Sequence, residues 1–175
     1  MLNITFPDGR NKKYEIGITG FDIAKDISTS LSKKAVAVKV DGQQKDLIDP
    51  IIEDSSISII TIDDSEGLEI MRHTLTAQVL AKAIKNLYPE SKLAIGPTID
   101  NGFYYDVLLK KPMSTEDFPR VEKEMRKIIN EGHLINKTLK NKKEAIDLFV
   151  KLDEPYKIEI INKSSQENNF QIYQQ

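Results

Sequence analysis

Apolar and polar residues alternate along the first part of the chain, apart from one stretch with a helical period. Alternation predicts strands at residues 2–6 and 13–16, and the Pro-Asp-Gly sequence between them predicts a hairpin turn. Apolar residues at every fourth position predict one amphipathic helix at residues 21–31. Two further alternating stretches, at residues 35–40 and 57–62, predict two more strands. This order of elements is typical of a β-grasp, ubiquitin-like fold.

Helical and extended patterns are mixed in the second part of the chain. Apolar residues keep a helical period in three stretches, at residues 71–87, 114–132 and 141–155. Ser114 with Asp117 and Asn141 with Glu144 have the spacing of a capping box, which marks two of the helix starts. Strand-like patterns occur at residues 92–96, 102–109, 156–161 and 170–173. The polar, acidic stretch at residues 63–67 is the expected boundary between the two parts.

Two sequence motifs resemble one family. Residues 92–107 read KLAIGPTIDNGFYYDV, and Arg72, His73 and Thr74 precede them; together they resemble the start of the editing domain of bacterial threonyl-tRNA synthetases. The first 62 residues, with MLNITFPDG at the start, resemble the TGS domain that begins many of these enzymes. The resemblance implies an α+β chain: a TGS-like β-grasp domain at 1–62, a linker at 63–67, and at 68–175 a threonyl/alanyl-tRNA synthetase second additional (editing) domain.

The resemblance implies a site that hydrolyses serine wrongly attached to threonine tRNA. In the family this site has an HxxxH pair on a helix, a lysine on a later strand, and a Cys-and-His segment. His73 matches the first histidine, and Lys157, in the sequence EPYKIEII, matches the lysine. Alignment requires one extra residue near Leu75, so that Gln78 stands at the place of the second histidine. The Cys-and-His segment would follow Gln175, so we expect a truncated editing domain with an incomplete site.

These residues also have interpretations without a catalytic role. His73 can equally be a partly exposed histidine at a helix start, and Lys157 can be a solvated lysine on a strand. Candidates for RNA contact are Tyr104, Lys137, Lys140, Lys142 and Lys143. Lysines neutralise phosphates and an aromatic ring can stack on a base, but the alternatives are a solvated basic face and a ring that fills a core.

Composition excludes several function classes. The formal net charge of -2 argues against an overall basic surface, so any tRNA contact is expected to be local, and DNA is not an expected partner. The chain has no cysteine and only two histidines, without zinc-type spacing, so no metal site is expected. In the family, ATP and zinc belong to the catalytic core, so no cofactor is expected here. No apolar run approaches ~18 residues, and we expect a cytoplasmic protein without a membrane span.

Three functional hypotheses follow. In the first, the chain is the N-terminal portion of a threonyl-tRNA synthetase, a family of ATP-dependent ligases with an editing hydrolase. Its partners would be tRNA and either the rest of the synthetase or another protein, and alone it would retain at most weak deacylation of mischarged tRNA. In the second, it is a free-standing TGS-containing module that binds RNA, a small ligand or a protein. In the third, it is an inactive truncated remnant.

Overall fold

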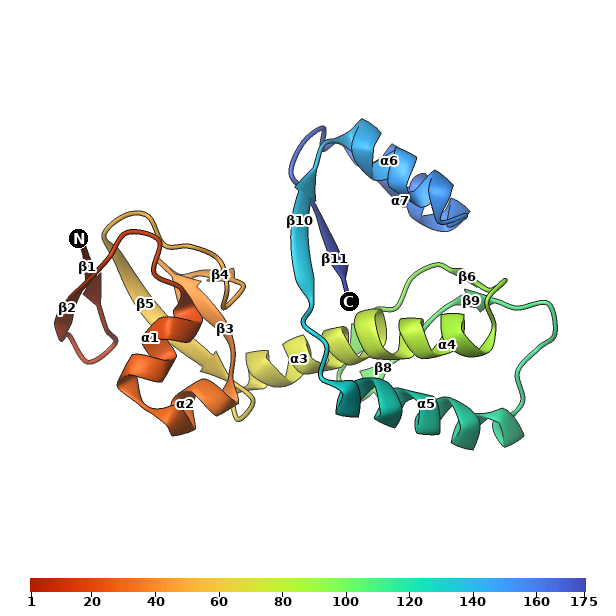
Figure 1. Ribbon diagram of the computed structural model, residues 1–175, viewed down its shortest axis with the longest axis horizontal. Helices are drawn as coiled ribbons and strands as arrows, with labels where there is room; N and C mark the ends of the chain where they lie inside the picture. Colours follow the sequence, from red (N-terminus) through yellow and green to blue (C-terminus); the bar gives the residue numbers. More distant parts are fainter. The chain divides into compact units, whose positions relative to one another are not determined.

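The computed structural model describes all 175 residues, which form two compact units, Met1–Met71 and Arg72–Gln175 (Figure 1). Each unit has its own hydrophobic core. Helix α3 (Ser65–Thr74) begins inside the stretch 63–67 that we expected as a linker, and the units divide within this helix. No helix combines the length and the apolar character that a membrane span requires.

A five-stranded sheet forms most of the first unit. Its strands are β1 (Leu2–Thr5), β2 (Asn11–Tyr14), β3 (Ala35–Val40), β4 (Gln43–Lys45) and β5 (Ser55–Thr61). Their order is β2-β1-β5-β3-β4, with β1 parallel to β5 and all other neighbours antiparallel. The predicted β-grasp fold is confirmed, and β4 is a strand that the sequence pattern had not indicated.

Two short helices, α1 (Gly20–Ile27) and α2 (Thr29–Lys34), replace the single helix predicted at residues 21–31. Ser28 separates them, because its backbone is extended and its side chain accepts a hydrogen bond from the Leu31 N–H at 3.0 Å, as the N-cap of α2. Apolar side chains of α1 and of the sheet form the core of the unit, with Ile4, Ile23 and Val38 fully buried.

Three consecutive helical segments lead into the second unit. Helix α3 is followed without a break by a π-helix, η1 (Leu75–Leu80), and by α4 (Ala81–Leu87). A 3-10 turn, η2 (Thr115–Asp117), precedes α5 (Phe118–Glu131), which packs along α4 (Figure 1). Ala81 and Ile84 of α4 and Val121 of α5 are buried in one core, which also includes Leu93. The helices predicted at 71–87 and 114–132 are confirmed, the first with an interruption that the pattern did not indicate.

Two short strand pairs follow α4 in the chain. Strand β6 (Lys92–Leu93) pairs with β9 (Val107–Leu108), and β7 (Thr98–Ile99) pairs with β8 (Gly102–Phe103), both antiparallel. Between the pairs the two segments stay joined by irregular hydrogen bonds, such as the one from the Asp106 N–H to the Ile95 carbonyl at 2.8 Å. The strands predicted at 92–96 and 102–109 are therefore confirmed only in part.

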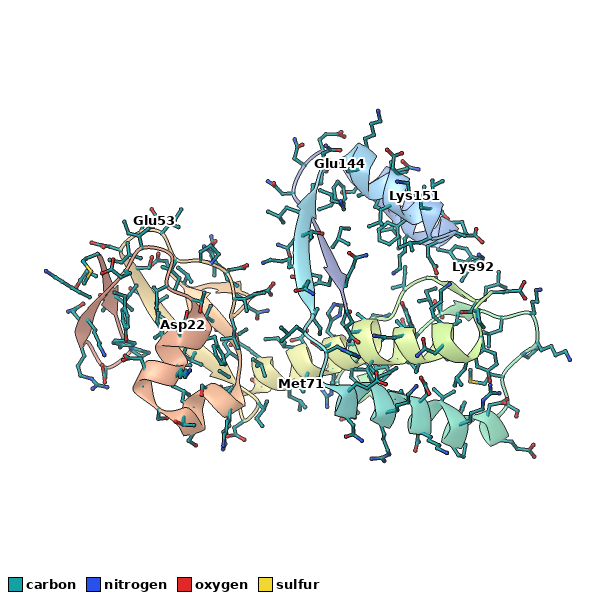
Figure 2. The ribbon with its side chains drawn as sticks, viewed as in Figure 1. Asp22, Glu53, Met71, Lys92, Glu144 and Lys151 are labelled. Atoms are coloured by element: carbon teal, nitrogen blue, oxygen red, sulfur yellow. The ribbon has the colours of Figure 1, made fainter.

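The last part of the chain consists of a strand pair and a helix pair. Strand β10 (Asn136–Lys140), which was not predicted, pairs antiparallel with β11 (Phe170–Gln174), and α6 (Lys142–Lys151) lies beside α7 (Pro155–Lys163) (Figure 1). Ala145, Ile161 and Ile172 form their shared core. Both predicted capping boxes are present, and the one between Asn141 and Glu144 opens α6. Glu144 is labelled in Figure 2.

The strand predicted at residues 156–161 is wrong, because these residues form helix α7. Pro155 occupies its first turn, where the missing N–H leaves no intrahelical bond unmade and the fixed φ suits a helix. Ile158 and Ile161 have helical spacing, and Ile161 is buried against Ala145. Packing on α6 therefore selects a helix over the strand that we predicted.

Candidate functional site

A π-helix lies directly after His73. At its end the Ala81 N–H donates to the carbonyl of Thr76, five residues back, where an α-helix uses the residue four back. Because a π turn contains one residue more than an α turn, η1 takes up the extra residue found near Leu75 relative to the editing-domain pattern. Gln78 consequently lies closer to the His73 side of the helix than residue i+5 of an uninterrupted α-helix would.

His73 and Gln78 differ in their exposure. His73 is exposed in the last turn of α3, whereas Gln78 is partly buried in η1. Between them, the hydroxyl of the fully buried Thr76 donates to the Arg72 carbonyl at 2.8 Å. The exposed imidazole and the partly buried amide thus lie in successive parts of one helical segment, and a catalytic role for His73 stays a prediction.

The GPTIDNGFYYD motif packs against the π-helix through a glycine. A Cβ atom built on Gly96 would lie 2.6 Å from the Thr76 Cγ2 atom and 2.5 Å from the Tyr105 Cδ2 atom. Only glycine fits between these side chains without a shift. Sequence positions 72–78 and 92–107, which carry the family resemblance, are therefore in direct contact.

The two tyrosines of the motif have different environments. Tyr104 is 54% exposed, and its backbone N–H donates to the Pro97 carbonyl at 3.3 Å. Tyr105 is half-buried, and burial, followed by the nearby Glu154 carboxylate, raises the pKa of its hydroxyl to about 12. The exposed ring of Tyr104 is accessible for stacking on a base, and that role stays a prediction.

Lys157 lies on helix α7, in place of the strand that we expected. Its side chain is half-buried, with the Nζ atom 5.9 Å from the centre of the Phe149 ring. Burial lowers the pKa of Lys157, the Glu154 carboxylate opposes this effect, and the Lys85 ammonium adds to it. A lysine in such surroundings differs from the solvated lysine of the alternative interpretation, and a catalytic role for Lys157 stays a prediction.

Sequence reasoning missed two residues next to Lys157. Lys85 and Glu154 form an ion pair in which the carboxylate is buried. Beside them Lys92 of β6 pairs with Asp153, and its Nζ atom also donates to the Asp153 carbonyl at 2.9 Å (Figure 2). No local pattern could have indicated these pairs, because the partners are far apart in the sequence.

The predicted basic cluster is distributed over several surfaces. Lys137 and Lys140 occupy positions of opposite parity on β10, so their side chains leave the strand on opposite sides. Lys142 donates to the Ser164 carbonyl at 2.9 Å and lies 3.2 Å from the Glu167 carboxylate, whereas Lys143 is exposed in the first turn of α6. Contact of these lysines with RNA stays a prediction.

Comparison with known proteins defines the first unit. Residues 2–61 match the family described as TGS domain. This match covers the β-grasp sheet and its helices. The first unit is therefore a TGS domain, in agreement with its fold and with the resemblance seen in the sequence.

The whole chain is similar to proteins named Threonine--tRNA ligase. It is 48% identical to the one from Hyphomonas neptunium over 162 residues, which are 93% of this chain and 24% of that protein. The proteins of Halalkalibacterium halodurans and Anoxybacillus flavithermus are 44% and 45% identical, each over 100% of this chain and 27% of its own length. The chain thus spans about a quarter of these relatives and corresponds to the N-terminal part of threonyl-tRNA synthetases.

Proposed function

We propose that this chain binds tRNA in the cytoplasm and releases serine from threonine tRNA that carries it by mistake. The observation that supports this most is the similarity, over the whole chain, to relatives named as threonine–tRNA ligases. In this proposal residues 68–175 are the editing part and the TGS domain contributes to tRNA binding. Joining threonine to tRNA, the reaction in the relatives' names, is not proposed for these residues alone.

Such an activity answers a physical limit of substrate selection. A binding pocket that accepts threonine can discriminate against serine, which lacks one methylene-sized group, by only about 1–3 kcal/mol. Serine therefore enters as well. A second, hydrolytic site then removes the product. Ester hydrolysis there needs a positioned water, a group that accepts its proton, and donors for the developing oxyanion.

Three side chains of this chain are suited to these tasks. The exposed His73 is of the residue type that accepts protons near neutral pH. Gln78, in the π-helix that follows, can hold a water by hydrogen bonds but cannot shuttle its proton. Lys157 can supply a positive donor for the oxyanion or the tRNA end. With glutamine where the family has its second histidine, the expected rate is low.

A role in binding without hydrolysis is the second candidate. The observation that favours it is Gln78, because loss of the second histidine removes a proton-transferring group from the proposed site. In that case the chain holds tRNA but leaves the ester intact. Release of serine from mischarged threonine tRNA distinguishes the two candidates.

Deacylation by the purified chain tests the proposed function. We expect serine to be released from mischarged threonine tRNA faster than in buffer, with correctly charged tRNA much less affected. His73→Ala should abolish the difference. His133→Ala is the matched control, because His133 is exposed and lies 3.3 Å from the Glu131 carboxylate, after α5. A rate equal to buffer, with tRNA still bound, contradicts hydrolysis and supports the binding role.

Binding of tRNA is measured separately, by fluorescence anisotropy at several salt concentrations. Charge reversal at Lys142 and Lys143 together should weaken binding and flatten its salt dependence. For each phosphate contact that is lost, binding releases about one counterion fewer. Lys163→Glu, an exposed lysine on α7, is the control. Unchanged affinity in the double variant contradicts a role of these two lysines.

A further inference from the structure

A buried carboxylate joins the start of helix α7 to helix α4 and strand β6. Glu154 is 4% exposed. Its Oε2 atom accepts a hydrogen bond from the Leu93 N–H at 3.0 Å, and its Oε1 atom lies 2.6 Å from the Lys85 Nζ atom. Lys85 also donates to the Ser91 carbonyl at 2.7 Å, so the ammonium is fixed from two sides.

One partner of this carboxylate lies in a packed core, and the other lies next to that core in the sequence. Leu93 is buried with Ile84 and Val121, and Lys85 follows Ile84 on α4. On its own side, the Glu154 N–H donates to the Phe149 carbonyl at 2.9 Å, which ties α7 to the end of α6. A buried charge that loses its partner is strongly disfavoured, so these contacts fix where α7 begins.

Lys157 follows Glu154 by about one helical turn. Its Nζ atom lies 5.9 Å from the centre of the Phe149 ring, on the side of α6. We propose that Glu154 is a positioning residue for Lys157: its contacts with Lys85 and Leu93 fix the start of α7 and so hold the Lys157 ammonium beside the Phe149 ring. The catalytic meaning of this placement rests on the proposed function, whereas the placement itself does not.

The charges around Lys157 make the placement measurable. Burial lowers the pKa of Lys157, the Glu154 carboxylate raises it, and the Lys85 ammonium lowers it. Other ionisable groups on the neighbouring segments are Lys92, Asp153 and Tyr105. When the Glu154 charge is removed, burial and Lys85 remain, and both favour the neutral amine.

The test is the pH profile of Lys157 acetylation by acetic anhydride, read by mass spectrometry on the folded 175-residue chain. Only the neutral amine reacts, so the midpoint of the profile reports the pKa of Lys157. Glu154→Gln keeps the shape and one oxygen for the Leu93 N–H while removing the charge. We expect the midpoint to fall by about one pH unit or more, because loss of a nearby opposite charge moves a pKa by about 1–3.

Two controls separate this effect from a general loosening. Asp153→Asn removes the neighbouring pair with Lys92 and leaves Glu154 in place, so we expect an unchanged Lys157 midpoint. Lys163, exposed on the same helix, is the internal reference in every variant. An unchanged midpoint in Glu154→Gln overturns the inference, and so does an equal fall in Asp153→Asn.

Lys85→Met keeps the inference testable if Glu154→Gln does not fold. The Leu93 N–H still holds the Glu154 carboxylate in this variant. Its midpoint for Lys157 should therefore rise, because only the repelling ammonium is lost; no rise overturns the inference. Acetylation requires no tRNA. A chain that fails to release serine therefore contradicts the proposed function alone, whereas unchanged acetylation profiles contradict the positioning alone.

Discussion

Gly96 and Thr76 approach so closely that a Cβ atom on Gly96 would lie 2.6 Å from the Thr76 Cγ2 atom. Thr76 is fully buried in the π-helix, so it has no room to withdraw. We predict that Gly96→Ala lowers the free energy of unfolding by about 1–3 kcal/mol, the usual cost of overpacking. Urea unfolding followed by circular dichroism measures it.

A double-mutant cycle tests whether this contact is the cause. Thr76→Ser removes the Cγ2 atom and should recover part of the stability lost by Gly96→Ala, with the remainder due to the Tyr105 ring. If the double variant is as unstable as the sum of the two single variants, the contact between the motif and the π-helix is not as described.

Deletion of Ala77 tests whether η1 takes up one extra residue. The deletion should convert the π turn into an α turn and leave both flanking helices in place, changing the free energy of unfolding by less than about 1 kcal/mol. Deletion of Lys127 in α5 is the control, since it should rotate the buried Ile128 by about 100° off the core and cost several kcal/mol. Equal losses in the two variants contradict the assignment.

The ion pair between Lys85 and Glu154 should also matter for stability. Glu154→Gln removes the buried carboxylate and leaves the partly exposed Lys85 ammonium with the Ser91 carbonyl. We predict a loss of about 1.5–3 kcal/mol in the free energy of unfolding, the usual range for a hydrogen bond to a charged group. Asp153→Asn, which breaks a pair whose carboxylate is exposed, should cost less than about 1 kcal/mol. Chemical unfolding of both variants measures the difference, and similar losses would show that burial of Glu154 is unimportant.

Tyr105 gives a pH dependence in alkaline solution. Its pKa is raised to about 12, chiefly by burial and further by Glu154, whereas an unfolded tyrosine titrates near 10. The folded state therefore keeps a proton that the unfolded state loses. This stabilisation is fully present below pH ~10 and is lost as pH rises toward ~12. The urea midpoint should fall more steeply in this window for the unchanged chain than for Tyr105→Phe; parallel curves contradict it.

Local signals in the sequence were sufficient for part of the fold. The capping box of Asn141 and Glu144 involves neighbouring residues only, and its spacing correctly gave the start of α6. The segment around Ile158 was different, because its apolar spacing fits a strand and a helix equally well. Burial of Ile161 against Ala145 decided for the helix, and that contact is not visible in the local pattern.

The candidate site was predictable only where the family resemblance reached. His73, Gln78 and Lys157 came from alignment to a motif. The ion pair of Lys85 with Glu154 joins residues distant in sequence, and a glutamate before a proline carries no sign of burial. The extra residue near position 75 was visible in the sequence, but the π-helix was not predicted. Helical periodicity alone does not distinguish a π turn from a rotated helix.

We propose that the π turn of η1 brings position 78 toward the His73 side of the helix, within the proposed editing site. The most direct measurement is serine release from mischarged threonine tRNA by Gln78→His, with Ala77→His as the control that adds a histidine on another face. We predict that Gln78→His raises the rate by about tenfold or more, since a positioned acid–base group contributes up to ~10²–10⁴-fold, and that Ala77→His does not. Equal rates in the two variants and the unchanged chain would contradict the claim.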